Sequence, residues 1–258
     1  MDISDILSDW PYDSDACVRK IVAEDGRELL QVRTPLGIEQ YELSGRPDGL
    51  RPYDCESVLE YVEGQSERHL PGPAASGEFE IDAETAAELQ HEGLIYYYRY
   101  LICFQIGEYA SVISDTYRNL RMFDLLKAWC TDADTVNSSE QYRPYVLRIN
   151  AAARALTAVA EEQHAQAKNI VLEAVRTIER LEHVPTATFD YERERSLAIL
   201  RGMLRAIPAE KRKTEADRLK DELTRAITEE NYERAAQLRD RLNALGPRER
   251  RSHSPSES

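Results

Sequence analysis

The sequence lacks any hydrophobic run long enough to cross a membrane, and its opening, MDISDILSDW, lacks the basic start of a secretory signal. Cysteine is scarce, with four widely spaced residues: Cys17, Cys55, Cys103 and Cys130. Structural zinc sites usually show paired ligands, so the absence of a C-x-x-C pair disfavours a zinc ribbon. Scattered cysteines without an export signal are typical of a reducing compartment. We therefore expect a cytoplasmic protein that holds no metal and contacts no membrane.

Catalytic motifs are also missing. The five histidines have no sequence neighbours that would complete a metal site or a catalytic triad: His69, His91, His164, His183 and His253. The pair His91-Glu92 lacks the second histidine, four residues after the first, that a zincin helix requires. No nucleotide-binding or hydrolase signature is present. These gaps favour a non-enzymatic protein that has no cofactor and no small-molecule substrate.

Positive charge is scarce and unevenly placed. The chain has 33 basic and 47 acidic residues, for a net charge of −14. Residues 1–82 hold 19 acidic and 7 basic side chains, whereas residues 211–251 carry a net charge of +3. A protein that grips duplex DNA through its phosphates should show a basic face. The composition therefore disfavours direct binding of nucleic acid by the chain as a whole.

An α+β organisation follows from the order of patterns along the chain. Residues 1–66 are predicted to form an acidic domain of three antiparallel strands and one helix, at residues 17–23, 28–34, 37–43 and 54–63. Gly26 lies in the first turn, where a positive φ is expected. Residues 67–82, rich in proline and glycine, are predicted to be a linker.

Helical spacing of apolar residues dominates residues 83–208. Five helices are predicted, at residues 83–103, 109–130, 141–161, 165–182 and 191–207, with a polar loop at residues 131–139. Similar turns at residues 107–110 and 162–165 suggest an array of helical hairpins with a tetratricopeptide-like (TPR-like) character. The Ser-rich residues 247–258 are expected to be a disordered tail.

The loop Gly45-Arg46-Pro47-Asp48-Gly49 has two possible interpretations. It lacks the Gly-Lys-Ser/Thr ending of a P-loop, and its proline removes an amide donor, so a structural turn with Arg46 and Asp48 exposed is favoured. The alternative is an anion site that uses Arg46 and Arg51. An enzyme in this domain would need a cleft that also includes Asp48 and Cys55.

Tyrosines are concentrated at Tyr96, Tyr97, Tyr98 and Tyr100, around Arg99. Three consecutive residues of a helix cannot all face the same core, so at least one tyrosine should lie near solvent. We expect Tyr97 and Tyr100 in the core, and a binding face is the alternative.

Residues 214–245 carry two amphipathic stripes. The first consists of Leu219, Leu223, Ala226 and Ile227, and the second of Tyr232, Ala235, Ala236, Leu238, Leu242 and Leu245. Residues 228–231 form a polar break with a capping residue at each end. Two helices with so short a connection must lie antiparallel, with the pair Ala235-Ala236 allowing close approach and Tyr232 closing one end of the seam. Residues 211–246 are therefore predicted to form a helical hairpin.

The stretch NYERAAQLRDRLNAL resembles the UVR motif, a hairpin shared by UvrB, UvrC and some Clp ATPases and arginine-kinase activators. The resemblance rests on Tyr232-Glu233, Ala235-Ala236, Leu238-Arg239-Asp240, Leu242 and Leu245. The N-terminal stretch DWPY and the segment from DGRELL to GLRP are also similar to uncharacterised bacterial UVR-motif proteins. Because UVR hairpins pair with a second hairpin or dock on a partner, the resemblance implies a protein–protein contact.

The leading hypothesis is thus an adaptor that recruits a protein partner, or dimerises, through residues 214–245. The predicted contact residues are Leu219, Leu223, Ile227, Tyr232, Ala235, Leu238, Arg239 and Leu242. Two alternatives stay open. One is an accessory protein of DNA repair, after UvrB and UvrC, and the other is an unrecognised enzyme of the N-terminal domain.

Overall fold

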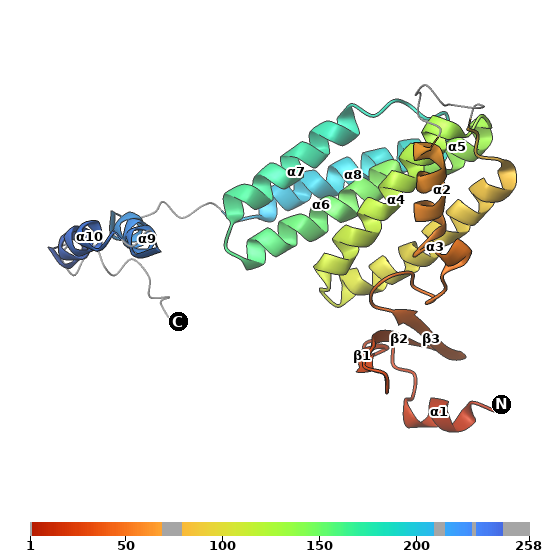
Figure 1. The fold of residues 1–258 in the computed structure, drawn as a ribbon, viewed down its shortest axis with the longest axis horizontal. Helices are drawn as coiled ribbons and strands as arrows, with labels where there is room; N and C mark the ends of the chain where they lie inside the picture. The colour runs from red at the N-terminus through yellow and green to blue at the C-terminus, as the bar shows by residue number, and fades with distance from the viewer. Residues whose placement is uncertain (1, 69–78, 209–214, 229–230, 245–258) are drawn as a thin grey trace. The chain divides into compact units, whose positions relative to one another are not determined.

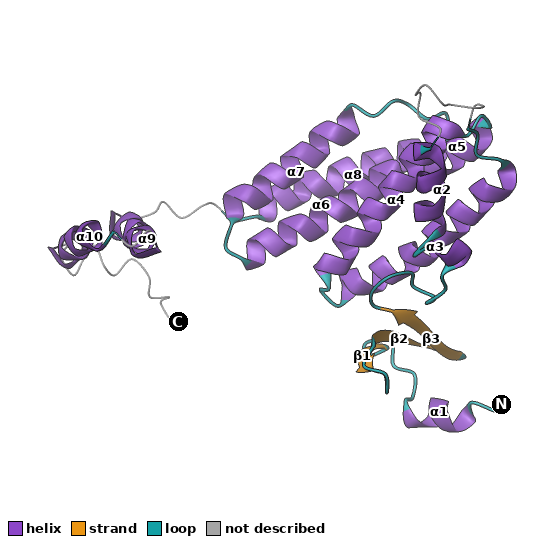
Figure 2. Ribbon diagram, in the orientation of Figure 1, coloured by secondary structure: helices purple, strands orange, loops and turns teal. Residues whose placement is uncertain are grey.

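The structure is a computed structural model that describes residues 2–68, 79–208, 215–228 and 231–244. The chain divides after Pro208 into two compact units, here called the body (residues 2–208) and the hairpin (residues 215–244). A short helix, α1 (Ser4–Asp9), comes first, a three-stranded antiparallel sheet follows, and the later elements are helices, so the predicted α+β class is confirmed (Figures 1 and 2). The tail predicted at residues 247–258 lies outside the described residues, as does most of the linker predicted at residues 67–82.

The sheet has the strand order β1-β2-β3, with β1 at Val18–Val22, β2 at Glu28–Thr34 and β3 at Gly37–Glu42. The first turn depends on Gly26, whose φ of +86° is strained for any residue with a side chain. Its N–H donates to the Ala23 carbonyl at 2.9 Å. On β2, Leu30 is fully buried and packs with Tyr100 and Cys103 of the helical region. The sheet is thus fixed to the helices by its central strand.

Helices form the remainder of the body. They are α1 (Ser4–Asp9), the 3-10 turn η1 (Pro52–Asp54), α2 (Val58–Glu67), α3 (Ala83–Gln105), α4 (Tyr109–Trp129), α5 (Ala133–Glu140), α6 (Arg143–Ala160), α7 (His164–Glu179) and α8 (Ala187–Ala206). Figure 1 shows α6, α7 and α8 lying side by side, and α3 packing against α4. The turns between α3 and α4 and between α6 and α7 contain residues of positive φ, Gly107 and Glu162.

Three predictions about helix positions are wrong. The helix expected at residues 54–63 lies at Val58–Glu67, because the Ser57 hydroxyl accepts from the Glu60 N–H at 3.0 Å and sets its start. Residues 131–139 were expected to be a loop, but most of them form α5, because the Asp132 side chain caps it by accepting from the Thr135 N–H at 3.0 Å. The last helix of the body begins four residues earlier than the predicted Tyr191, because the Thr186 hydroxyl accepts from the Phe189 N–H at 3.1 Å. In all three cases a capping side chain set a helix start that hydrophobic spacing missed.

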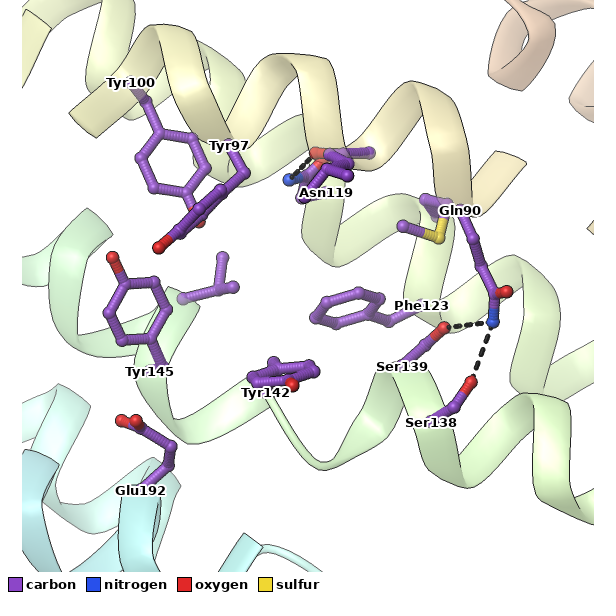
Figure 3. A pocket seen from close by; sticks show the side chains of 14 residues that line it. Gln90, Tyr97, Tyr100, Asn119, Phe123, Ser138, Ser139, Tyr142, Tyr145 and Glu192 are labelled. Atoms are coloured by element: carbon purple, nitrogen blue, oxygen red, sulfur yellow. Dashed lines mark hydrogen bonds between the residues drawn. The ribbon is translucent and has the colours of Figure 1, made fainter. Parts of the chain in front are cut away.

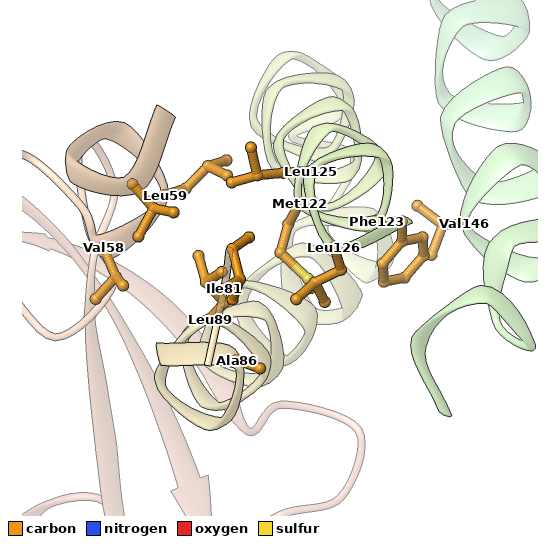
Figure 4. Packing of buried hydrophobic residues seen from close by; sticks show 11 residues of the cluster. Val58, Leu59, Ile81, Ala86, Leu89, Met122, Phe123, Leu125, Leu126 and Val146 are labelled. Atoms are coloured by element: carbon orange, nitrogen blue, oxygen red, sulfur yellow. The ribbon is translucent and has the colours of Figure 1, made fainter. Parts of the chain in front are cut away.

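One hydrophobic cluster crosses the boundary predicted between the N-terminal domain and the helical array. Val58 and Leu59 of α2 pack in the same cluster as Leu89 of α3 and Leu126 of α4 (Figure 4). Each of these four side chains is buried. The body therefore shares a core across this boundary, and the domain limits at residues 66 and 83 stay predictions.

The tyrosine-rich stretch lies on α3 and is largely core. Tyr96 and Tyr100 are buried, Tyr97 is half-buried, and Tyr98 is exposed. The prediction that at least one of these tyrosines lies near solvent is confirmed. Arg99 is also buried, although it carries a charge.

Candidate interaction site

The hairpin consists of α9 (Glu215–Thr228) and α10 (Tyr232–Ala244). Asn231 forms the entry to α10, because its side-chain oxygen accepts from the Arg234 N–H at 3.1 Å. The Asn231 N–H donates to the Ala226 carbonyl at 2.8 Å and so joins the end of one helix to the start of the next. The chain reversal is therefore fixed by a side-chain cap and one backbone hydrogen bond.

Four side chains form the buried core of the hairpin: Leu219, Ala226, Ala235 and Leu238. Leu223 and Leu242 pack against this core and are partly buried. Alanine at two of the four core positions allows the helix axes to approach closely. Outside the core, Arg234 lies 3.5 Å from Glu222, a surface ion pair that contributes little. The hairpin thus depends on a small apolar seam.

The predicted contact residues separate into two groups. Leu219, Ala235 and Leu238 are buried within the hairpin, and Leu223 and Leu242 are partly covered. The other three residues are exposed: Ile227, Tyr232 and Arg239. The structure therefore assigns the first group to holding the helices together, while the role of every one of these residues in binding stays a prediction.

Among the described residues of the hairpin, Ile227 and Tyr232 are the large apolar side chains that are exposed. Ile227 is 54% exposed in the last turn of α9, and Tyr232 is 68% exposed as the first residue of α10. The expectation that Tyr232 closes the seam is wrong, since most of its surface faces solvent. Both residues flank the connection between the helices, so this end presents apolar surface that a protein partner could cover.

Arg239 contributes charge rather than apolar area. Its guanidinium donates to Asp240 Oδ1 at 3.1 Å from Nε and at 2.9 Å from Nη2. Both side chains are exposed, so this ion pair stabilises the hairpin very little. The surface around Arg239 is therefore polar.

Comparison with known protein families identifies this segment. Residues 213–246 match the UvrB/uvrC motif. The resemblance seen in the sequence is thereby confirmed for the hairpin, which we call the UVR hairpin. No curated protein and no solved structure matches the chain. The similarity to uncharacterised bacterial proteins is therefore not supported by a match. UVR motifs are found in excision-repair proteins and in protein-interaction roles.

The loop around Arg46 differs from the sequence prediction. Asp48 is exposed as expected, but the Arg46 side chain is largely buried, with its Nε 3.0 Å from Asp48 Oδ1 and 3.5 Å from Glu92 Oε1. The prediction that Arg46 is exposed is therefore wrong. Two carboxylates already neutralise this guanidinium, which disfavours the alternative of an anion site there.

Glu92 is the centre of a charge cluster that sequence reasoning missed. Its carboxylate is fully buried on α3 and accepts from the N–H groups of Val58 at 2.8 Å and Leu59 at 3.1 Å, at the start of α2. The guanidinium of Arg118 on α4 contacts the same carboxylate. Burial, together with the charge of Arg46, lowers the pKa of Arg118 to about 9, so Arg118 remains charged at neutral pH. Glu92 thus ties α2 to α3 and α4.

Arg99 makes a second connection of this kind. It donates to both carboxylate oxygens of Asp115 on α4, at 2.8 and 2.6 Å, and to the carbonyls of Glu42 and Gly45, each at 2.8 Å. Burial raises the pKa of Asp115, and the hydrogen bonds from Arg99 oppose that shift. The sequence signal was an arginine within an apolar, tyrosine-rich helix, a place where a charge must find a partner. Arg99 therefore joins the end of β3 to the helices.

Among the described residues, no cluster of three or more His, Cys, Asp or Glu side chains could hold a metal ion. None of the helices described is long and apolar enough to span a membrane. Cys103 is buried, and burial raises its pKa to about 11, which makes the thiol a poor nucleophile.

Proposed function

We propose that the protein is an adaptor whose UVR hairpin binds another helical hairpin, either in a partner protein or in a second copy of this chain. The observation that carries the proposal is the exposure of Ile227 and Tyr232 at the connected end of the motif. Leu219 and Leu238 are buried in the seam, so among the described residues of the hairpin Ile227 and Tyr232 are the large apolar side chains left exposed for a partner. Their polar neighbours would form the rim of the contact.

The size of the exposed patch formed by Ile227 and Tyr232 sets the expected affinity of the contact. Covering the free parts of Ile227 and Tyr232 contributes on the order of 2–4 kcal/mol. Association also costs several kcal/mol of lost translational and rotational freedom. These two residues alone would give a transient contact, and a tighter complex needs further surface from α9 or α10. The proposed adaptor therefore binds reversibly unless its partner covers much of the hairpin.

The test exchanges both exposed apolar residues without touching the seam. The variant is Ile227→Gln with Tyr232→Gln, and Arg225→Gln, at an exposed polar position on α9, is the matched control. Sedimentation of the full chain at increasing concentration measures self-association, and affinity capture measures partners. We expect the double variant to lose association and the control to keep it, with helix content unchanged in both. Association that persists in the folded double variant would refute the proposal.

A DNA-repair accessory is the second candidate, because residues 211–251 carry a net charge of +3 in an otherwise acidic chain and include the UVR motif. It predicts binding to duplex DNA that weakens steeply with salt and that disappears when residues 209–258 are removed. Fluorescence anisotropy of a labelled duplex measures this binding. Absence of binding at low salt would dismiss this candidate and leave the adaptor proposal standing.

A further inference from the structure

A cavity of about 440 Å³ lies in the helical part of the body (Figure 3). Its walls come from α3, α4, α5, α6 and α8. Tyr142, at the start of α6, is 46% exposed and Leu94 of α3 is also exposed, so the cavity reaches the surface. This volume falls within the range typical of small-molecule sites. The cavity is thus large enough and open enough to admit a ligand.

Aromatic rings dominate the wall. They are Tyr97, Tyr100, Phe123, Tyr142 and Tyr145. Tyr97 and Tyr145 pack with their ring centroids 6.1 Å apart, and Figure 3 shows their hydroxyl groups turned toward each other. The face of an aromatic ring carries partial negative charge and attracts cations. A set of such rings favours a ligand that combines apolar groups with positive charge.

Glu192 is the charged side chain among the described residues that line this cavity. Its side chain is 12% exposed, and its Oε2 is shielded from solvent and accepts no hydrogen bond from the described residues. Arg195 Nη1 lies 3.9 Å from the other oxygen, Oε1. Arg148 donates from Nε to Ser196 Oγ at 3.2 Å and stacks over the ring of Tyr145. One buried carboxylate oxygen is therefore left without a donor, which is costly unless something supplies one.

The opposite end of the cavity offers few donors for an anion. The side-chain nitrogen of Gln90 donates to Ser138 Oγ at 2.9 Å and to Ser139 Oγ at 3.0 Å (Figure 3). The Ser138 hydroxyl donates in turn to the Thr135 carbonyl at 2.7 Å. With these donors used internally and a carboxylate on the wall, the cavity disfavours negatively charged ligands.

We propose that this cavity binds a small organic cation, an ammonium or guanidinium ion that carries an apolar group. The cationic N–H pairs with the Glu192 carboxylate, whose shielded Oε2 reaches the cavity when the side chain turns. The apolar group lies against the rings of Tyr97, Tyr142 and Tyr145. A free amine and the basic side chain of a peptide share this chemistry. The site is separate from the UVR hairpin, so its occupancy does not depend on the adaptor proposal.

The test compares two probes of nearly the same shape, 2-phenylethylammonium and the uncharged 2-phenylethanol. Titration calorimetry with the full chain measures both. We expect the ammonium ion to bind about tenfold tighter, because it adds a charge-assisted hydrogen bond and cation–π contacts. Glu192→Gln keeps the shape of the side chain and should remove this preference while leaving the binding of the alcohol unchanged. The matched control is Glu194→Gln, at an exposed position on the same helix, which should behave as the wild type.

A second variant and a third probe complete the design. Tyr142→Leu removes an aromatic face from the rim and should weaken binding of the ammonium ion several-fold, with the thermal unfolding midpoint confirming that the variant is folded. Tight binding of N-acetyl-arginine amide would identify a basic peptide as the source of the cation, and tighter binding of the amine would identify a free ligand. Equal binding of the two phenylethyl probes, no effect of Glu192→Gln, or no binding of any cation in the millimolar range would overturn the proposal.

Discussion

The body and the UVR hairpin are stabilised in different ways. In the body, apolar clusters are joined by buried charges, with Glu92 contacting Arg118 and Arg99 contacting Asp115. In the UVR hairpin, four small or aliphatic side chains form the core, and its described ion pairs are exposed. Buried charges fix a geometry strictly, because a misplaced partner leaves an unpaired charge. The body is thus built to keep one arrangement, whereas the UVR hairpin is a marginal unit that a partner could stabilise.

The largest effect is expected in the body, from Glu92→Ala. The change leaves Arg118 buried without its carboxylate and removes the acceptor at the start of α2, which should cost about 3–5 kcal/mol of the free energy of unfolding. Both tryptophans, Trp10 and Trp129, lie in the body, so urea unfolding followed by fluorescence reports on this unit. Glu84→Gln, at an exposed position on α3, should change the free energy of unfolding by less than about 0.5 kcal/mol. Equal effects of the two changes would show that the buried cluster does not stabilise the body.

The next effect is expected in the UVR hairpin, from Leu238→Ala. Deleting a buried leucine side chain costs about 2–5 kcal/mol, and a unit with four buried core residues has little stability to lose. Hydrogen exchange should show α9 and α10 losing protection together, while the fluorescence transition of the body stays unchanged. Gln237→Ala, at the exposed neighbouring position, should leave the protection unchanged. A body that is destabilised by Leu238→Ala would mean that the two units are not independent.

The difference between the two units also explains what the sequence could predict. The hairpin follows from local signals, since the apolar stripes and the Asn231 cap lie within a few residues of their partners. The first turn of the sheet is equally local, because Gly26 alone supplies the positive φ. Charges in the body pair across elements, as Glu92 does with Arg118, and no local pattern indicates which arginine a carboxylate will meet. For the same reason the burial of Arg46 was missed.

The hairpin also shows a limit of pattern reasoning. The stripes correctly placed Leu219 and Leu238 on the apolar faces of the two helices. A stripe does not, however, distinguish residues buried between the helices from residues left for a partner. The structure makes this distinction for Tyr232, which lies on the predicted stripe and is nevertheless exposed. The position of Glu192 in the wall of the aromatic cavity could likewise not be predicted, since this residue is far along the chain from the tyrosines that line the cavity.

The smallest effect on stability is expected from lowering the pH. This effect should differ between the two units, because their helices are capped by different residues. In the body, α3 and α5 are capped by Asp82 and Asp132, and hydrogen bonds from Thr85 and Thr135 hold the pKa of each carboxyl below its usual value. Because the folded-state pKa is lowered, this stabilisation is complete above the ordinary value of about 4 and is lost as the pH falls through the folded-state pKa. The double variant Asp82→Asn with Asp132→Asn keeps an acceptor at each cap but cannot titrate. Urea midpoints of the body should therefore fall less between about pH 5 and pH 3 in the variant than in the wild type.

In the UVR hairpin the Asn231 cap already cannot titrate, so the protection of the first turn of α10 should not depend on this carboxylate chemistry. If the wild type and the variant lose stability in parallel, acid acts on the body through its other carboxylates instead.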